Sequence, residues 1–333
     1  MNNQQKSLRI GAAVILFAIA LRFFSSSFAA DFSALQQNFS LTKLLLYAGT
    51  GRVYSLAEPD PPPPAETQPE PTQTPTEPVP EEPVQAVFSQ EDAILVSLKN
   101  YPGYDIDVAA MLDAPLEWDL TNQSPTVLIF HSHTSESYEN TEGYIPSDPY
   151  RTKDERYNMV SIGAHLAKCL QEKGISVIHD TTVHDYPSYN DAYHLSRKTV
   201  QQYLEAYPSI TLVLDIHRDA YQDASGNQAS NTVTVDGKEA SLLMLVAGTD
   251  AGGSSHSAWR ENLSVAVKLH TVLQKQYPGL CRNITVRSSH FNQDLSPGAL
   301  LVEVGTAGDT RQEALYAAEL LADGIARLAH GSS

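Results

Sequence analysis

Cysteine and basic residues are scarce in this sequence of 333 residues. Its two cysteines, Cys169 and Cys281, are too few for a disulfide framework, and they do not form a C-x-x-C pair. We expect two buried thiols, with a single disulfide as the alternative. Lys and Arg number 22 against 39 Asp and Glu, which gives a formal charge of −17. This balance argues against nucleic acid as a partner, because phosphate binding needs a basic face.

An uninterrupted apolar run of the roughly 20 residues that span a membrane is also missing near the N-terminus. Residues 10–21 are apolar, Lys6 and Arg9 precede them, and Arg22 follows. Positive charge followed by an apolar run is typical of a signal anchor or an export signal. We predict that residues 1–30 are a retained anchor in the cell membrane or, alternatively, a signal peptide cleaved near residues 27–30. Either reading places the rest of the chain outside the cytoplasm.

Residues 58–83 contain eleven prolines and seven acidic residues but no Lys or Arg. Such a segment cannot bury enough apolar surface to offset the entropy of ordering. We therefore interpret residues 31–86 as a spacer and a disordered linker rich in Pro and Glu. Residues 87–123, which favour a helix and a loop, are interpreted as an N-terminal extension of a catalytic domain formed by residues 124–333.

From residue 124 onward, apolar runs alternate with stretches of helical periodicity. The expected strands are 126–130, 175–178, 210–216, 232–235, 240–246, 284–287 and 299–304. The expected helices are 155–173, 188–206, 257–277 and 311–329. Asp236-Gly237 predicts a hairpin between residues 232–235 and 240–246. This alternation indicates an α/β fold of three layers, αβα, around a mixed, mostly parallel sheet.

Three of these strands end in residues that can carry chemistry. The run 127–130 leads into His131-Ser132-His133 and then Glu136, and the run 211–216 leads into His217. Glu303 lies inside the apolar run 300–304. A buried carboxylate without a cationic partner costs several kcal/mol, and a metal site supplies such a partner. Ligand sites of α/β sheets lie at the carboxyl ends of strands, where these residues are expected to meet.

Two ligand sets fit a zinc ion with three protein ligands and one open position. The first is His131, His133 and His217, and the second is His133, Glu136 and His217. Asp215 shares a strand face with His217 and is expected to orient its imidazole, or else to pair with Arg218 or Arg156. Glu303 is the candidate general base for a zinc-activated water. Arg218 is a candidate for stabilising the oxyanion, with a surface ion pair as the alternative.

Several motifs together resemble the stage II sporulation protein P family. They are residues 127–138, 156–160, 184–189, 213–220 and 292–305, in that order. The resemblance covers about residues 124–330 and implies an amidase-like fold. It further implies a zinc-dependent N-acetylmuramoyl-L-alanine amidase that acts on peptidoglycan during engulfment in sporulation, with endopeptidase activity on cross-links also associated with the family. The implied partners are the D and M proteins of the same stage.

The same resemblance assigns roles to particular residues. It places zinc ligands at His133 and His217 and the catalytic glutamate at Glu303. Related amidases carry a glutamate ligand at the start of the first helix, where this sequence has Asn158, a poor zinc ligand. Glu136 therefore becomes the expected third ligand. Two other functions fit the sequence: a zinc peptidase of carboxypeptidase type, and a non-catalytic scaffold that binds the cell wall.

Overall fold

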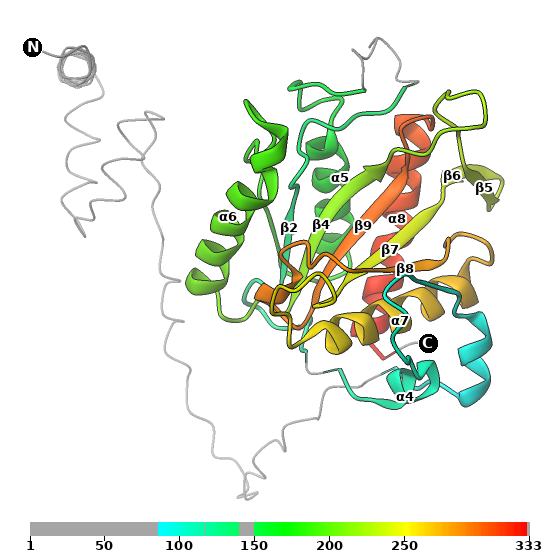
Figure 1. Ribbon diagram of the computed structural model, residues 1–333. Helices are drawn as coiled ribbons and strands as arrows, with labels where there is room; N and C mark the ends of the chain where they lie inside the picture. Colours follow the sequence, from blue (N-terminus) through cyan, green and yellow to red (C-terminus); the bar gives the residue numbers. More distant parts are fainter. Residues whose placement is uncertain (1–85, 117, 140–149, 332–333) are drawn as a thin grey trace, which may run out of the picture. The chain divides into compact units, whose positions relative to one another are not determined.

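The computed structural model describes residues 86–116, 118–139 and 150–331 (Figure 1). By its internal contacts the chain divides into two units, residues 1–78 and 79–333, and the description concerns the second. The predicted membrane segment and the predicted linker up to residue 85 lie outside the described residues. Within the described ranges, no helix is both long and apolar enough to cross a membrane.

A seven-stranded sheet, in the order β1-β8-β7-β9-β4-β2-β3, organises the second unit. Its strands are β1 (Leu98–Asn100), β2 (Val127–Phe130), β3 (Val177–His179), β4 (Leu212–Asp219), β7 (Leu243–Gly248), β8 (Ile284–Arg287) and β9 (Ala299–Thr306). All neighbouring strands are parallel except β7 and β9, which are antiparallel. The predicted α/β class with a mixed, mostly parallel sheet is confirmed.

Helices cover both faces of this sheet. They are α5 (Met159–Glu172), α6 (Ala192–Ala206), α7 (Trp259–Gln276) and α8 (Arg311–Ala329). Val127 and Ile129 of β2 belong to one hydrophobic core with α5, α7 and α8. Leu128 and Phe130 belong to a second core with α6. Because successive side chains of a strand point to opposite faces, the two cores form a three-layer arrangement, and Figure 1 shows α5 and α6 on either side of β2.

The helices follow their predicted apolar periodicity, but α5 begins later than expected. Met159, Ile162 and Leu166 of α5 are all fully buried. The predicted start was Glu155, whereas Asn158 has extended backbone and its side-chain oxygen accepts a hydrogen bond from the Val160 amide. The first amides of a helix have no partner within the helix, and an Asn side chain just before the helix can accept a hydrogen bond from one of them. Asn158 has this role, so the helix begins at Met159.

The predicted hairpin is correct in its turn but not in its second strand. β5 (Thr232–Val235) pairs with β6 (Lys238–Ser241) in a separate two-stranded sheet. The predicted strand 240–246 is divided at Leu242, and its second part is β7 of the main sheet. Lys238 and Glu239 are exposed, which suits a small ribbon, whereas the apolar run after Leu242 needs a sheet that is covered on both faces.

The segment before β2 contains more regular structure than the predicted helix and loop. It comprises the 3-10 helix η1 (Gln90–Leu95), strand β1 and helix α4 (Val108–Asp113). β1 extends the sheet by pairing with β8. Helix α7 holds α4 through side chains, because Ser264 Oγ and Lys268 Nζ donate to the carbonyls of Met111 and Leu112. β1 was not predicted because its three residues are too few to show a period.

The carboxyl ends of β2, β4 and β9 lie at the same edge of the sheet, since these neighbouring strands are parallel. His217 is the register partner of Glu303 across β4 and β9. The turn that follows β2 carries His133 and Glu136. The expectation that the candidate residues meet at strand ends is thus met by the topology of the sheet.

Candidate metal centre

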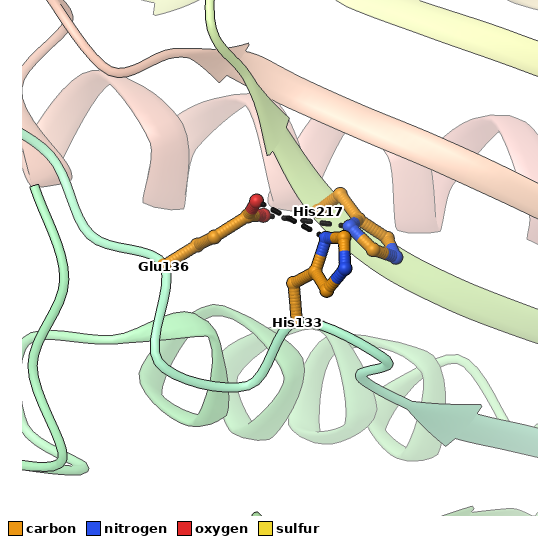
Figure 2. Close-up of side chains that lie close together, drawn as sticks. All are labelled: His133, Glu136 and His217. Carbon is orange, nitrogen blue, oxygen red and sulfur yellow. Dashed lines mark ion pairs between the residues drawn. The ribbon is translucent and has the colours of Figure 1, made fainter. Parts of the chain in front are cut away.

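His133, Glu136 and His217 bring their polar atoms together at this edge (Figure 2). Glu136 Oε1 lies 3.4 Å from His133 Nδ1, and Glu136 Oε2 lies 3.4 Å from His217 Nδ1. The two imidazole rings are 5.1 Å apart and nearly perpendicular. One carboxylate therefore faces one nitrogen of each ring.

The turn after β2 places His133 and Glu136 on the same side. The Glu136 amide donates to the His133 carbonyl at 3.1 Å, and this closes a single turn between the two residues. Thr134 Oγ1 donates to the His131 carbonyl at 2.9 Å and fixes the start of the turn. Side chains three residues apart in such a turn lie on the same side, so His133 and Glu136 can both direct a ligand atom to one metal ion.

Glu136 and His217 are both buried, and their charges stabilise each other. Burial alone raises the pKa of Glu136, but Arg218, followed by His133 and His217, outweighs burial and holds that pKa well below its usual range. Burial alone lowers the pKa of His217, but the carboxylates of Asp215 and Glu136 raise it well above the usual value. Both shifts favour an ionised carboxylate beside a protonated imidazole.

Asp215 contacts the outer nitrogen of His217. Its Oδ1 lies 2.8 Å from His217 Nε2 and accepts a hydrogen bond from the Ser132 amide at 2.8 Å. Its Oδ2 accepts from the Ser132 hydroxyl at 2.6 Å. Of the contacts expected for Asp215, the structure thus shows the one with His217, and Nδ1 of that ring is left facing Glu136.

A chain of buried polar groups extends from Asp215 to the loop before β9. Ser132 Oγ lies 2.8 Å from Ser196 Oγ on α6, and Asn292 Nδ2 donates to Ser196 Oγ at 3.1 Å. Asn292 and its neighbour Phe291 have φ angles of 60° and 50°, in the left-handed region. Such backbone is strained for Phe in particular. The hydrogen-bonded chain therefore joins a strained loop to the carboxylate that orients His217.

Glu303 lies next to His217 on the neighbouring strand, and one of its carboxyl oxygens lacks a hydrogen bond to any described residue. Its Oε2 is inaccessible to solvent and has no hydrogen-bond partner among the described residues. Burial raises the pKa of this carboxyl to about 8, against the opposing effect of His217. A buried carboxyl with a raised pKa at a strand end is a candidate acid or base.

Arg218 is buried and interacts with the protein on all sides of its guanidinium group. Nη1 lies 3.3 Å from Glu136 Oε1, while Nε and Nη2 donate to the carbonyls of Ser137 and Tyr150 at 3.0 Å each. The ion pair expected as the alternative for Arg218 is thus formed with Glu136, and it is buried rather than at the surface. Arg156, the other possible partner of Asp215, pairs with Asp154 instead.

His131 and Asn158 do not join the cluster in the described structure. His131 Nδ1 lies 2.9 Å from the Ile216 carbonyl, so it donates there, and Nε2 lies 2.9 Å from His179 Nε2. Burial, followed by the nearby His179, lowers the pKa of His131 to about 3. Asn158 is engaged as the cap of α5. Cys169 and Cys281 are free thiols, of which only Cys281 is fully buried.

Aromatic residues that the sequence analysis did not single out line the cluster. The Tyr189 ring stacks on His133 at 4.1 Å, and Tyr193 lies edge-on to His133 at 5.3 Å. Tyr193 is also parallel to the His217 ring at 6.5 Å. The only sequence signal for Tyr189 was its place in the motif 184–189.

The donor set fits a divalent metal such as zinc. One nitrogen of each histidine and one oxygen of Glu136 lie within 4.8 Å of one another. Two imidazoles and a carboxylate are a common ligand set of catalytic zinc sites. Asp215 is the kind of outer carboxylate that fixes a ligating imidazole.

Comparison with known proteins connects this centre to a family. The family model for stage II sporulation protein P matches residues 53–326. Stage II sporulation protein P of Bacillus subtilis (strain 168) is 28% identical over 219 residues, which cover 61% of this chain and 51% of that protein. The chain thus spans about half the length of this curated relative.

Among solved structures, the apo form of the N-acetylmuramyl-L-alanine amidase Ami1 from Mycobacterium abscessus matches with a TM-score of 0.35 and 13% identity. That match covers 61% of this chain and 95% of the amidase chain. The family model, by contrast, spans most of the present sequence. The chain therefore belongs to the stage II sporulation protein P family.

Proposed function

We propose that this protein is a zinc-dependent peptidoglycan hydrolase that cleaves the amide between the lactyl group of muramic acid and the L-alanine of the stem peptide. The observation that carries the proposal is the buried, unsatisfied Oε2 of Glu303, whose register partner His217 belongs to a cluster of three metal-ligand candidates. Membership of the sporulation family supports a cell-wall substrate, and the choice of bond rests on what the resemblance of the sequence motifs to that family implies.

In this proposal His133, Glu136 and His217 hold the zinc ion, and Asp215 keeps the His217 ring in place. Bound zinc supplies a Lewis acid that polarises the scissile carbonyl and makes water more acidic. A cation held beside Glu303 would favour its ionised form, and the carboxylate would then accept a proton from the attacking water as the new C–O bond forms. It then returns the proton to the leaving nitrogen as the C–N bond breaks.

The context of the activity is proposed on the basis of the family alone. We expect the catalytic unit to act outside the cytoplasm, tethered through the N-terminal segment, during engulfment. The D and M proteins of the same sporulation stage are the expected partners. Co-purification of either protein with the full-length chain from sporulating cells tests this part separately from the chemistry.

The decisive experiment is a product analysis. The purified full-length chain is loaded with zinc and incubated with peptidoglycan sacculi, and the soluble products are identified by mass spectrometry. An amidase releases stem peptides with a free L-alanine amino terminus. Release of single terminal amino acids indicates a carboxypeptidase instead, new amino groups at cross-links indicate an endopeptidase, and binding to sacculi without products indicates a scaffold.

A further inference from the structure

Tyr189 places a hydroxyl group directly at the candidate metal centre. Its oxygen lies 3.2 Å from His133 Nδ1, the same nitrogen that faces Glu136. The residue is 40% exposed, whereas His217 and Glu136 are buried. Tyr189 thus lies between the buried ligand atoms and solvent.

The ring of Tyr189 is fixed on both faces. It stacks on His133 at 4.1 Å, and the Arg151 guanidinium carbon lies 3.7 Å from the ring centre. Two groups in van der Waals contact with a ring cannot share one face, so Tyr189 is held between them. A donor held in place before the reaction loses little free energy to reorganisation.

The loop that carries Tyr189 is tied to the turn that carries the metal-ligand candidates. Asp185 accepts hydrogen bonds from the Ser135 amide at 3.2 Å and from the Ser135 hydroxyl at 2.5 Å. His184 Nδ1 contacts the His131 carbonyl at 2.8 Å. The motif 184–189 therefore positions Tyr189 relative to His133 and Glu136. The motif contains none of the candidate metal ligands, so the placement of Tyr189 accounts for a role that the ligands do not explain.

Arg218, the donor expected from the sequence, is poorly placed for substrate. Its side chain is buried, with 4% exposure, and it donates to Ser137 and Tyr150 while pairing with Glu136. Because the guanidinium group of Arg218 is buried and bonded to these protein groups, it balances the charge of Glu136. It is poorly placed to donate to the carbonyl of a bound substrate. Tyr189 is the more exposed of the two residues, at 40%.

We propose that Tyr189 donates the hydrogen bond that stabilises the carbonyl oxygen of the scissile amide as negative charge develops on it. The inference rests on the proposed hydrolysis. Once Nδ1 of His133 is committed to the metal, the hydroxyl no longer has that nitrogen as an acceptor and can donate its proton to substrate instead. Tyr189 keeps its proton throughout, while Glu303 carries the proton from water to the leaving nitrogen.

The test compares Tyr189→Phe with wild type on sacculi. Phe keeps the ring between His133 and Arg151 and removes only the hydroxyl. We expect kcat to fall about 100-fold, as for the loss of an oxyanion donor in other hydrolases, with little change in KM or zinc content. Tyr186→Phe is the matched control, because Tyr186 belongs to the same motif but packs against Lys153 instead. A kcat for Tyr189→Phe within twofold of wild type overturns the inference.

A second measurement needs no turnover. Zinc added to the metal-free chain should displace the hydroxyl from His133 and change the ultraviolet absorbance of tyrosine. The change should be absent in Tyr189→Phe and present in Tyr186→Phe, and zinc affinity should stay within about threefold of wild type in both. If zinc changes the absorbance of Tyr189→Phe as much as that of wild type, the hydroxyl of Tyr189 is not displaced by the metal, and the inference falls. If Tyr189→Phe loses tenfold in zinc affinity, Tyr189 is a metal ligand and not a donor to substrate.

The two proposals fail in different ways. If zinc-loaded wild type releases no product from sacculi, the proposed function and this inference both fall. If wild type is active and Tyr189→Phe is equally active, only the role of Tyr189 falls.

Discussion

His217 and Glu303 occupy paired positions on the neighbouring parallel strands β4 and β9. One is a candidate metal ligand, and the other is a buried carboxyl that has an unsatisfied oxygen. Side chains at paired positions of adjacent strands lie on the same face of the sheet. The sheet itself therefore sets the separation between ligand and base, without help from a loop.

Replacing Glu303 with Gln should reduce product release from sacculi by at least about 100-fold, the usual contribution of a general base. The amide cannot accept the proton of water, but it fills the same space. Zinc content, measured by atomic absorption, should remain equal to that of wild type. Full activity in this variant removes Glu303 from the mechanism.

Metal-free Glu303→Gln should be more stable than metal-free wild type, and the difference should grow with pH. Burial raises the pKa of Glu303 to about 8, against about 4.3 in an unfolded chain. Between these values the folded state holds a proton that the unfolded chain has lost, so wild-type stability falls as pH rises. In urea, the free energy of unfolding of Glu303→Gln should exceed that of wild type by more than about 2 kcal/mol at pH 8 and by less at pH 5. A difference that does not change with pH contradicts the raised pKa of Glu303.

Asp215→Asn should weaken zinc binding by about 10- to 100-fold, the usual effect of losing an outer carboxylate. The amide cannot match the charge that Asp215 places 2.8 Å from His217 Nε2. Competition with a chromophoric chelator measures the affinity. Asp154→Asn is the control, because Asp154 pairs with Arg156 on the exposed surface and should leave zinc affinity unchanged.

Zinc should raise the melting temperature of the metal-free chain, since a ligand of the folded state stabilises it. This increment should vanish in His133→Ala. It should persist in His131→Asn, although that variant starts from a lower melting temperature because the contacts with Ile216 and His179 are lost. Loss of the increment in both variants would return His131 to the ligand set.

Asp323→Asn should lower stability at pH 7 by about 1 kcal/mol, the scale of partly exposed ion pairs. Asp323 contacts Lys173, Tyr277 and Arg327 and so joins α8 to the ends of α5 and α7. Burial opposes ionisation, but these partners lower the pKa of Asp323 to about 2. The stabilisation is therefore complete above about pH 4 and disappears as pH falls through 2. Urea midpoints of the two proteins should approach each other as pH falls from 4 and should converge at about pH 2 and below; equal midpoints at pH 7 exclude the effect.

The sequence by itself determined the class of the fold and the strands that carry His217 and Glu303. Apolar runs rich in β-branched residues specify buried strands wherever they stand in a chain. The carboxyl ends of parallel neighbours then lie at one edge. Those two rules need only local sequence, and they predicted that His217 and Glu303 lie near each other at one edge of the sheet, whereas their paired positions on neighbouring strands come from the structure.

The residue pattern after β2 left His131 and His133 as alternative ligands, the family resemblance favoured His133, and the tertiary structure supplies the physical reason for the choice. An extended chain would put His131 and His133 on the same side, but β2 ends at Phe130 and the chain turns. The direction of each ring is then set by distant partners: Ile216 and His179 hold His131, while Tyr189 holds His133. These partners lie about 50 residues or more away in sequence, so no local pattern encodes the contact, and only the packed sheet brings them together.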